Sequence, residues 1–434
     1  MKKDIYHLEV TTDSDEVISE INHFIFQIIS SGKNADTILT AAINLPNNLL
    51  IQCYAAIFYL YAQENQYTLI ANSYIKNAEK LLPFANQREQ LFYQAILAWK
   101  NLDYELAVNL FINITELWPQ DVAAAKFAEW MFYCSGQAYH AKRFLMMCEN
   151  MKNHHSMNSH FLAIYAFALE LSGQFEKSFE VATRAIEIEP HTPWAHHALS
   201  HDYLMTTKIE QGIVALESFK PSWKTILPAL KCHNTWHLGL LYLADLNEKK
   251  AKNLYTTDIW GNAPDSVLEQ IDAISFLWRM DMAGLPQNEE WRKIDKHLGK
   301  HPIECYMPFN NAHFIYALVK SKGTEIANKA VQQIENDANT LSGNSYRLWH
   351  TITKPFLHGC IAFADGDYSR ANEYLDPIIN EVFCVGGSDA QDELFTQTYL
   401  LSLIKTNQRK KATNYFEKYL LHYQHTPLSQ YWFE

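Results

Sequence analysis

The stretch from Leu102 to Phe111 (LDYELAVNLF) decides how the fold of this chain is interpreted. A small residue, Ala107, stands five positions after Leu102, the aromatic Phe111 stands nine positions after it, and Pro119 follows at seventeen. Two antiparallel helices pack closely where a small side chain faces a large one across a short turn. The stretch therefore predicts the turn of a helical hairpin.

The same pattern recurs along the chain. Gly136 and Gly173 begin further copies, and the three turn positions are 34 and 37 residues apart, which is the period of tetratricopeptide (TPR) repeats. Weaker copies begin at Thr207, Leu246, Gly366 and Asn407. The predicted fold class is all-α, a TPR-like superhelix in which stacked helical hairpins form a solenoid. The first helix of each repeat then lines the concave surface, where ligands bind.

Length and composition agree with this architecture. The chain has 434 residues, of which 48% are hydrophobic and 19% charged, so a large core is expected. Gly and Pro number 14 each, which is low for a β-rich or doubly wound fold with many turns. Three sections are predicted in one continuous solenoid: an N-terminal helical cap over 1–90, repeats with the histidine pairs over 91–260, and C-terminal repeats over 261–434.

Charge and cysteine usage narrow the partners and the compartment. Lys and Arg number 36 against 48 Asp and Glu, a net charge of −12, which argues against nucleic-acid binding. The N-terminus is charged where a secretory signal would be apolar, and no apolar run is long enough to span a membrane. Seven scattered cysteines without a CxxC pair are expected to be reduced thiols. A cytoplasmic protein that does not bind membranes is predicted.

Two histidine pairs carry the strongest functional signal. His197 and His201 form one His-x3-His pair, and His233 and His237 form the other. Residues four apart share one helix face, so each pair can approach one metal ion or one substrate. The two pairs are 36 residues apart, which places them at equivalent positions in neighbouring repeats. A further step of about the same period reaches Asp272, which would add a carboxylate to the four imidazoles.

A plainer interpretation stands beside this one, because histidine pairs on helices commonly bond to backbone or solvent. Neither pair is an HExxH motif, and the glutamate that acts as general base in zinc proteases is missing. Trp194 and Trp236, beside the pairs, are typical of core aromatic residues. The alternative is a wall on which a substrate stacks.

Several ordered motifs in residues 150–400 resemble the tetratricopeptide repeat protein 38-like family. They are Tyr165–Glu170 (YAFALE), Trp194–His201 (WAHHALSH), His233–Tyr242 (HNTWHLGLLY), Asp272–Arg279 (DAISFLWR), Pro308–His313 (PFNNAH) and Gly386–Gln391 (GGSDAQ). The resemblance implies a TPR-like solenoid without a well-established activity. It also implies functional polar positions at His197, His201, His233, His237, His313 and Gln391.

The chain departs from the family pattern at two of these motifs. Asn311 stands where the family usually has an aspartate, which weakens an acid–base or ligand role there. Asp389 replaces a usual histidine, which retains a metal ligand or base and changes the charge at neutral pH. Specificity or activity is therefore expected to differ from that of relatives.

Two hypotheses follow, and whether the protein is an enzyme stays open between them. In the first, a histidine-lined pocket binds a small polar ligand or a metal ion and supports hydrolase- or lyase-type proton transfer. The predicted catalytic residues are His197, His201, His233, His237, His313 and Asp272. The predicted ligand-binding residues are Trp194, Trp236, Arg279, Asn311, Asp389 and Gln391. A divalent metal is the candidate cofactor, with His197, His201, His233 and His237 as its candidate ligands. In the second hypothesis, the groove is a scaffold for a partner peptide.

Overall fold

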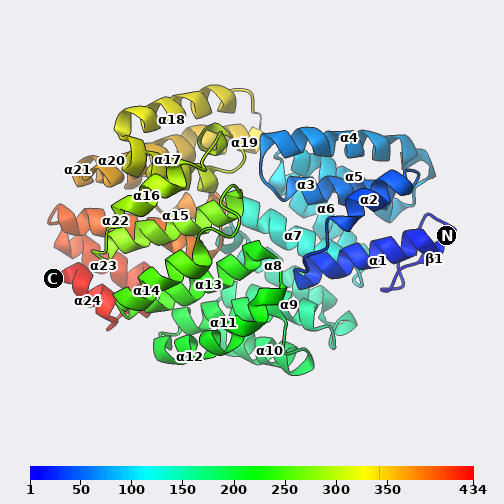
Figure 1. Ribbon diagram of the computed structural model, residues 1–434, viewed down its shortest axis with the longest axis horizontal. Coiled ribbons are helices and arrows are strands. Elements are labelled where there is room, and N and C mark those ends of the chain that lie inside the picture. The colour runs from blue at the N-terminus through cyan, green and yellow to red at the C-terminus, as the bar shows by residue number, and fades with distance from the viewer. Residues whose placement is uncertain (342) are drawn as a thin grey trace. The chain divides into compact units, whose positions relative to one another are not determined.

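The computed structural model describes residues 1–341 and 343–434 and is built almost entirely of helices (Figure 1). The predicted all-α class is confirmed, with packed helical hairpins repeated along the chain. The chain divides into two compact units. The first contains Met1–Leu199 and Ser222–Leu230, and the second contains Ser200–Pro221 and Lys231–Glu434. The division of the solenoid into sections at 1–90, 91–260 and 261–434 stays a prediction.

The first unit begins with a short antiparallel strand pair and continues as helices. Its elements are β1 (Lys2–Lys3), β2 (Glu9–Val10), α1 (Asp15–Ser30), α2 (Thr37–Asn44), α3 (Leu49–Leu60), α4 (Asn65–Leu81), η1 (Leu82–Phe84), α5 (Gln87–Lys100), α6 (Tyr104–Leu117), α7 (Val122–Ser135), α8 (Gln137–Met151), η2 (Lys152–His154), α9 (Ser159–Leu171) and α10 (Phe175–Ile188). Neighbouring helices pack in pairs, α3 on α4, α5 on α6, α7 on α8 and α9 on α10. Three elements run from one unit into the other: α11 (Pro193–Met205), η3 (Lys220–Thr225) and α13 (Pro228–Ala244).

The second unit repeats the same plan. Its further elements are α12 (Ile209–Phe219), α14 (Glu248–Leu254), η4 (Tyr255–Ile259), α15 (Val267–Met282), α16 (Asn288–Asp295), η5 (His301–Ile303), α17 (Pro308–Lys322), α18 (Thr324–Ala338), α19 (Gly343–Leu348), η6 (Trp349–Thr353), α20 (Lys354–Asp365), α21 (Tyr368–Leu375), η7 (Val382–Cys384), α22 (Asp389–Lys405), α23 (Arg409–Tyr419), η8 (Leu421–Tyr423) and α24 (Pro427–Phe433). The elements η4 and η6 are single π-helical turns. Helices α17, α18, α20 and α21 lie side by side (Figure 1), and α22 packs on α15, α21 and α23.

The predicted turn positions share a positive φ angle. All seven have a positive φ, from 49° to 95°: Leu102, Gly136, Gly173, Thr207, Leu246, Gly366 and Asn407. A residue with positive φ ends one helix and directs the chain into the next, and glycine adopts such an angle without strain. Five positions after each of six turns stands a small, buried residue: Ala107, Ser178, Gly212, Ala251, Ala371 and Ala412. The hairpins therefore close where the repeat pattern predicts.

Polar caps and buried apolar side chains hold these helices in place. Asp103 and Asp367 each follow a turn position and accept a hydrogen bond from the main-chain N–H three residues later, which caps the second helix of the hairpin.

The seven cysteines carry free thiols, as predicted. Among the helices described, none combines the length and apolar character needed to cross a membrane.

Candidate histidine–carboxylate site

Five predicted site residues, all within the second unit, lie together on four helices. His201 lies on α11, His233 and His237 on α13, Asp272 on α15 and Asp389 on the first turn of α22. We call these five residues the histidine–carboxylate cluster. His201, His237 and Asp272 are buried, and His233 and Asp389 are partly exposed.

One end of the cluster is a chain of a carboxylate and two imidazoles. His233 Nδ1 lies 3.2 and 3.1 Å from the two carboxylate oxygens of Asp272. His233 Nε2 lies 3.2 Å from Nε2 of His237. Because a carboxylate accepts hydrogen bonds, it favours the proton of His233 on Nδ1, and the neutral ring then presents a lone pair at Nε2. The spacing of four residues on α13 thus aligns the two rings as predicted.

The other end of the cluster pairs His201 with Asp389. His201 Nδ1 lies 3.0 Å from Asp389 Oδ1, and the ring of His201 is fully buried. Its centroid is 4.5 Å from that of His237, and the two residues offer ligand nitrogens within 4.8 Å of each other. His237 is therefore the middle ring of the cluster, with His233 and His201 on either side.

Trp236 packs against His233 of the cluster, and Arg279 packs against Trp236. Trp236 is buried and stacks on His233, with ring planes 11° apart and centroids 5.4 Å apart. The Arg279 guanidinium lies 5.2 Å from the Trp236 ring, donates to Ser275 Oγ, and donates at 2.6 Å to the carbonyl oxygen of Ala390. Burial lowers the pKa of Arg279 to about 10, which leaves it charged. Arg279 thus ties α15 to the start of α22, next to Asp389.

Two predicted ligand-binding side chains shape the backbone. Asn311 Nδ2 donates to the carbonyl oxygens of Pro302 and Glu304, 3.3 and 3.1 Å away, which fixes the loop before α17. Gln391 forms a capping box with Ser388, in which its Oε1 accepts from the Ser388 N–H at 3.0 Å. Both side chains therefore form hydrogen bonds with main-chain groups near the start of their own helix.

His313, a predicted catalytic residue, occupies an aromatic box. Its Nδ1–H donates to the carbonyl oxygen of Phe309 at 2.8 Å, and its ring neighbours are Phe309, Trp278 and Phe395. Burial lowers the pKa of His313 to about 3, so the ring is neutral. None of the three clustered histidines is among its contacts in the described chain.

The remaining predicted residues, Trp194 and His197, belong to the first unit. His197 is buried, with its ring beside those of Trp194 and Phe167 at 5.4 and 4.9 Å. Lys126 Nζ lies 3.4 Å above the Trp194 ring. His197 precedes His201 by one turn of α11, and its participation in the cluster stays a prediction.

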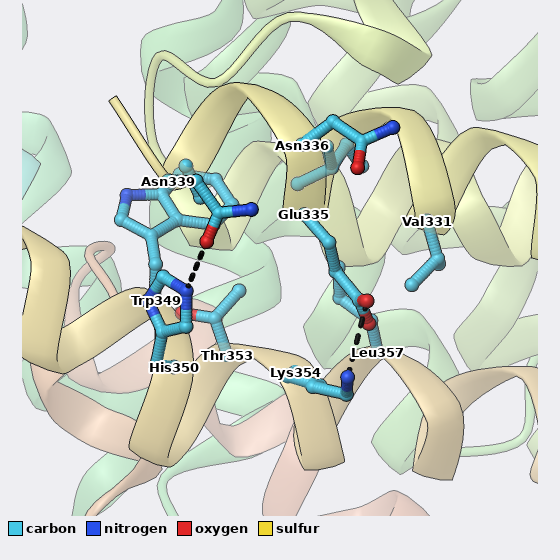
Figure 2. A pocket seen from close by; sticks show the side chains of 11 residues that line it. Val331, Glu335, Asn336, Asn339, Trp349, His350, Thr353, Lys354 and Leu357 are labelled. Carbon is cyan, nitrogen blue, oxygen red and sulfur yellow. Dashed lines mark hydrogen bonds and ion pairs between the residues drawn. The ribbon is translucent and has the colours of Figure 1, made fainter. Parts of the chain in front are cut away.

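A pocket of about 200 Å³ lies elsewhere in the second unit, between α18 and the segment formed by η6 and α20 (Figure 2). Its polar side chains pair across the opening: His350 Nε2 lies 2.9 Å from Asn339 Oδ1, and Lys354 Nζ lies 3.1 Å from Glu335 Oε2 (Figure 2). Trp349 and Leu357 contribute apolar surface. Sequence patterns did not point to this pocket, because the π-helical turn η6 that lines it has no simple residue signature.

Two acidic residues beside the cluster also lacked a predicted role. Asp392 and Glu393 follow Asp389 on α22, and Glu393 pairs with His422 and accepts from the Tyr423 hydroxyl at 3.0 Å. The spacing of three residues between Asp389 and Asp392 was the available signal, because it places both on one helix face.

In comparisons with known proteins, no protein-family model matches this chain.

Proposed function

We propose that the histidine–carboxylate cluster binds a divalent transition-metal ion and that the protein is a metal-dependent enzyme of the hydrolase type acting on a small polar substrate. The observation that carries the proposal is the approach of His233 Nε2 and His237 Nε2, 3.2 Å apart in the interior. We also propose a TPR-like protein of the tetratricopeptide repeat protein 38-like family, located in the cytoplasm. The repeated hairpins and the free thiols support these two assignments.

The nitrogen separation is the one that a shared metal ion requires. Imidazole nitrogens bind Zn²⁺ at about 2.0–2.1 Å, so two ligands at a tetrahedral centre lie roughly 3.3 Å apart. His233 and His237 meet this spacing without movement. His201, which has a ligand nitrogen within 4.8 Å of one of His237, is the proposed third ligand. Imidazoles suit zinc, copper, iron and nickel, whereas magnesium and calcium prefer oxygen ligands.

The carboxylates occupy the places where metal-binding histidines need partners. A metal-bound imidazole usually donates its second ring N–H to a carboxylate, which fixes the tautomer and raises the basicity of the ligand nitrogen. Asp272 stands behind His233 at 3.1 Å and Asp389 stands behind His201 at 3.0 Å. At His233 the Nδ1 contact with Asp272 is a hydrogen bond, so Nε2 is the nitrogen that would hold the ion. At His201 the Nδ1 contact with Asp389 is an ion-pair contact.

This arrangement supports hydrolysis more readily than a passive structural role. Three protein ligands at a zinc ion leave a fourth position for water, and the ion when bound lowers the pKa of that water to about 7. The chain from Asp272 through His233 to His237 holds the ligands in one tautomer. The Asp389 carboxylate, partly exposed beside His201, is placed to accept a proton from the substrate or from water.

Elemental analysis tests the proposal. The protein is purified without a histidine tag and without added metal, in parallel with His201→Ala/His237→Ala and with a control, His154→Ala/His191→Ala, which removes two exposed histidines of the first unit. We expect about one zinc-like ion per chain in the wild type and the control, and its loss in the cluster variant at unchanged helical content. Metal-free wild-type protein, or equal metal in the cluster variant, would contradict the proposal and favour the peptide scaffold.

A further inference from the structure

The pocket between α18 and the segment formed by η6 and α20 is a second candidate binding site of the second unit. None of the described residues that line it belongs to the histidine–carboxylate cluster, and its volume is about 200 Å³. A water molecule takes about 30 Å³ in the liquid, so the pocket has room for a ligand of roughly seven to ten non-hydrogen atoms. The ligand that fits it is therefore a small molecule.

The buried part of the pocket wall is apolar. Four buried side chains form it: Val331 and Ile334 of α18, Trp349 of η6 and Leu357 of α20. An apolar group of a ligand that contacts this wall leaves water, which favours binding. Part of the ligand should therefore be a hydrocarbon group.

The exposed part of the wall carries one negative and one positive charge. Glu335 Oε2 lies 3.1 Å from Lys354 Nζ across the opening (Figure 2), and Glu335 Oε1 lies 3.7 Å from His358 Nε2. The Glu335 and Lys354 side chains are 31% and 51% exposed, and an ion pair this exposed contributes little to stability, so the two groups can exchange partners. Because they lie so close together, a ligand that pairs with both must carry its own two charges on one carbon atom.

His350 and Asn339 add a place for an N–H donor beside this pair. His350 Nδ1–H donates to the main-chain carbonyl oxygen of Tyr346 at 2.8 Å, so Nε2 of the neutral ring carries a lone pair. This nitrogen lies 2.9 Å from Asn339 Oδ1, which is also an acceptor (Figure 2). Asn339 follows Glu335 by one turn of α18, on the same helix face. A ligand ammonium group at this face would meet three acceptor groups.

The backbone of η6 is a second feature typical of a binding site. This π-helical turn supplies Trp349, His350 and Thr353 to the pocket wall, and Lys354 follows it directly. Single π-helical turns occur frequently at functional sites. The unusual turn and the pocket therefore coincide.

We propose that this pocket binds a free α-amino acid with a small apolar side chain. Its ammonium group pairs with Glu335 and Asn339, its carboxylate pairs with Lys354, and its side chain contacts Trp349 and Leu357. An amine or a carboxylate alone would leave one of the two charges of the pocket without a partner from the ligand. The proposal is independent of the metal site.

Calorimetric titration of the full chain with L-valine tests the proposal, alongside two analogues: isobutylamine, which lacks the carboxylate, and 3-methylbutanoate, which lacks the ammonium. We expect L-valine to bind at one site per chain, and each analogue to bind at least about tenfold more weakly. Glu335→Gln and Lys354→Met should each weaken the binding of L-valine by a similar factor. The control is Glu325→Gln/Lys329→Met, which removes an exposed ion pair of the same helix and should leave the affinity unchanged.

A second variant, Asn339→Ala, removes one acceptor without a change of charge and should also weaken binding, with circular dichroism showing that each variant is folded. The absence of saturable L-valine binding to the wild type at millimolar concentrations would overturn the proposal. Equal binding of L-valine and both analogues, or binding unchanged in all three pocket variants, would also overturn it. His201→Ala/His237→Ala should still bind L-valine, so failure of this site and failure of the metal site are distinguished.

Discussion

Two sets of buried or half-buried histidines in this protein differ in their partner atoms. His155, His196 and His313 each bond to a main-chain carbonyl oxygen, at 3.0, 3.1 and 2.8 Å, and burial lowers the pKa of each, to about 4, 4 and 3. The clustered histidines instead face carboxylates and one another. A carbonyl partner fixes a neutral ring as part of the core, whereas a carboxylate partner prepares a ring to bind a cation.

The comparison is most informative at His196, because it adjoins His197 in sequence. Its Nε2–H donates to the Pro190 carbonyl oxygen, and its Nδ1 accepts from the Trp223 indole N–H at 3.1 Å. Both ring nitrogens are thus used by the core. A histidine in a conspicuous motif can therefore be purely structural, and the partner atoms decide which it is.

The largest expected effect is on stability, in the core group. His313→Ala removes a fully buried ring from between Phe309 and Phe395 and leaves a cavity. Replacing a buried aromatic ring by alanine typically lowers the free energy of unfolding by about 3–5 kcal/mol. Urea unfolding would measure the loss, with His191→Ala, an exposed position, as control. A loss below about 1 kcal/mol would place His313 outside the core group.

The second expected effect is a loss of stability at low pH that comes from His196. Because the pKa of His196 is lowered to about 4, the unfolded chain takes up its proton from about pH 6.5 downwards while the folded chain does not. Stability is therefore full above about pH 6.5 and falls as the pH drops towards 4, by up to about 3 kcal/mol from this residue. His196→Asn keeps a hydrogen-bonding group and should flatten this fall in unfolding experiments. An equally steep fall in the variant would show that His196 is protonated in the folded protein.

The smallest effect is on the cluster, where binding and not folding should change. Asp272→Asn keeps the shape of the side chain and removes the charge behind His233. Loss of such a partner typically weakens metal binding by 10–100-fold, or about 1.4–2.7 kcal/mol. Calorimetric titration with Zn²⁺ would measure it against Asp376→Asn, a more exposed aspartate paired with Lys411. An unchanged Zn²⁺ affinity would show that the carboxylate beside His233 does not prepare the clustered histidines for metal binding.

Local spacing predicted the hairpins well, because helix turns depend on residues close in sequence. The weak copies at Leu246 and Asn407 also have a positive φ, although leucine rarely adopts such an angle. The pairing of His233 with His237 was likewise predictable from one helix face, and the repeat period reached Asp272.

Contacts between distant segments were beyond local spacing. Asp389 on α22 lies beside His201 on α11, a contact between segments far apart in the sequence. Asp389 was predicted as a site residue only from the family resemblance. The side chains of Asn311 and Gln391 form hydrogen bonds with main-chain groups near the start of their own helices, because free main-chain groups there compete for polar side chains.

X-ray absorption spectroscopy of protein loaded with one equivalent of Zn²⁺ tests the central claim most directly. We expect an ion bound by at least two imidazole nitrogens at about 2.0–2.1 Å, with that signal lost in His201→Ala/His237→Ala. A spectrum of oxygen ligands only, or an imidazole signal unchanged in the variant, would contradict it. The clustered histidines would then belong with His155, His196 and His313 in the core.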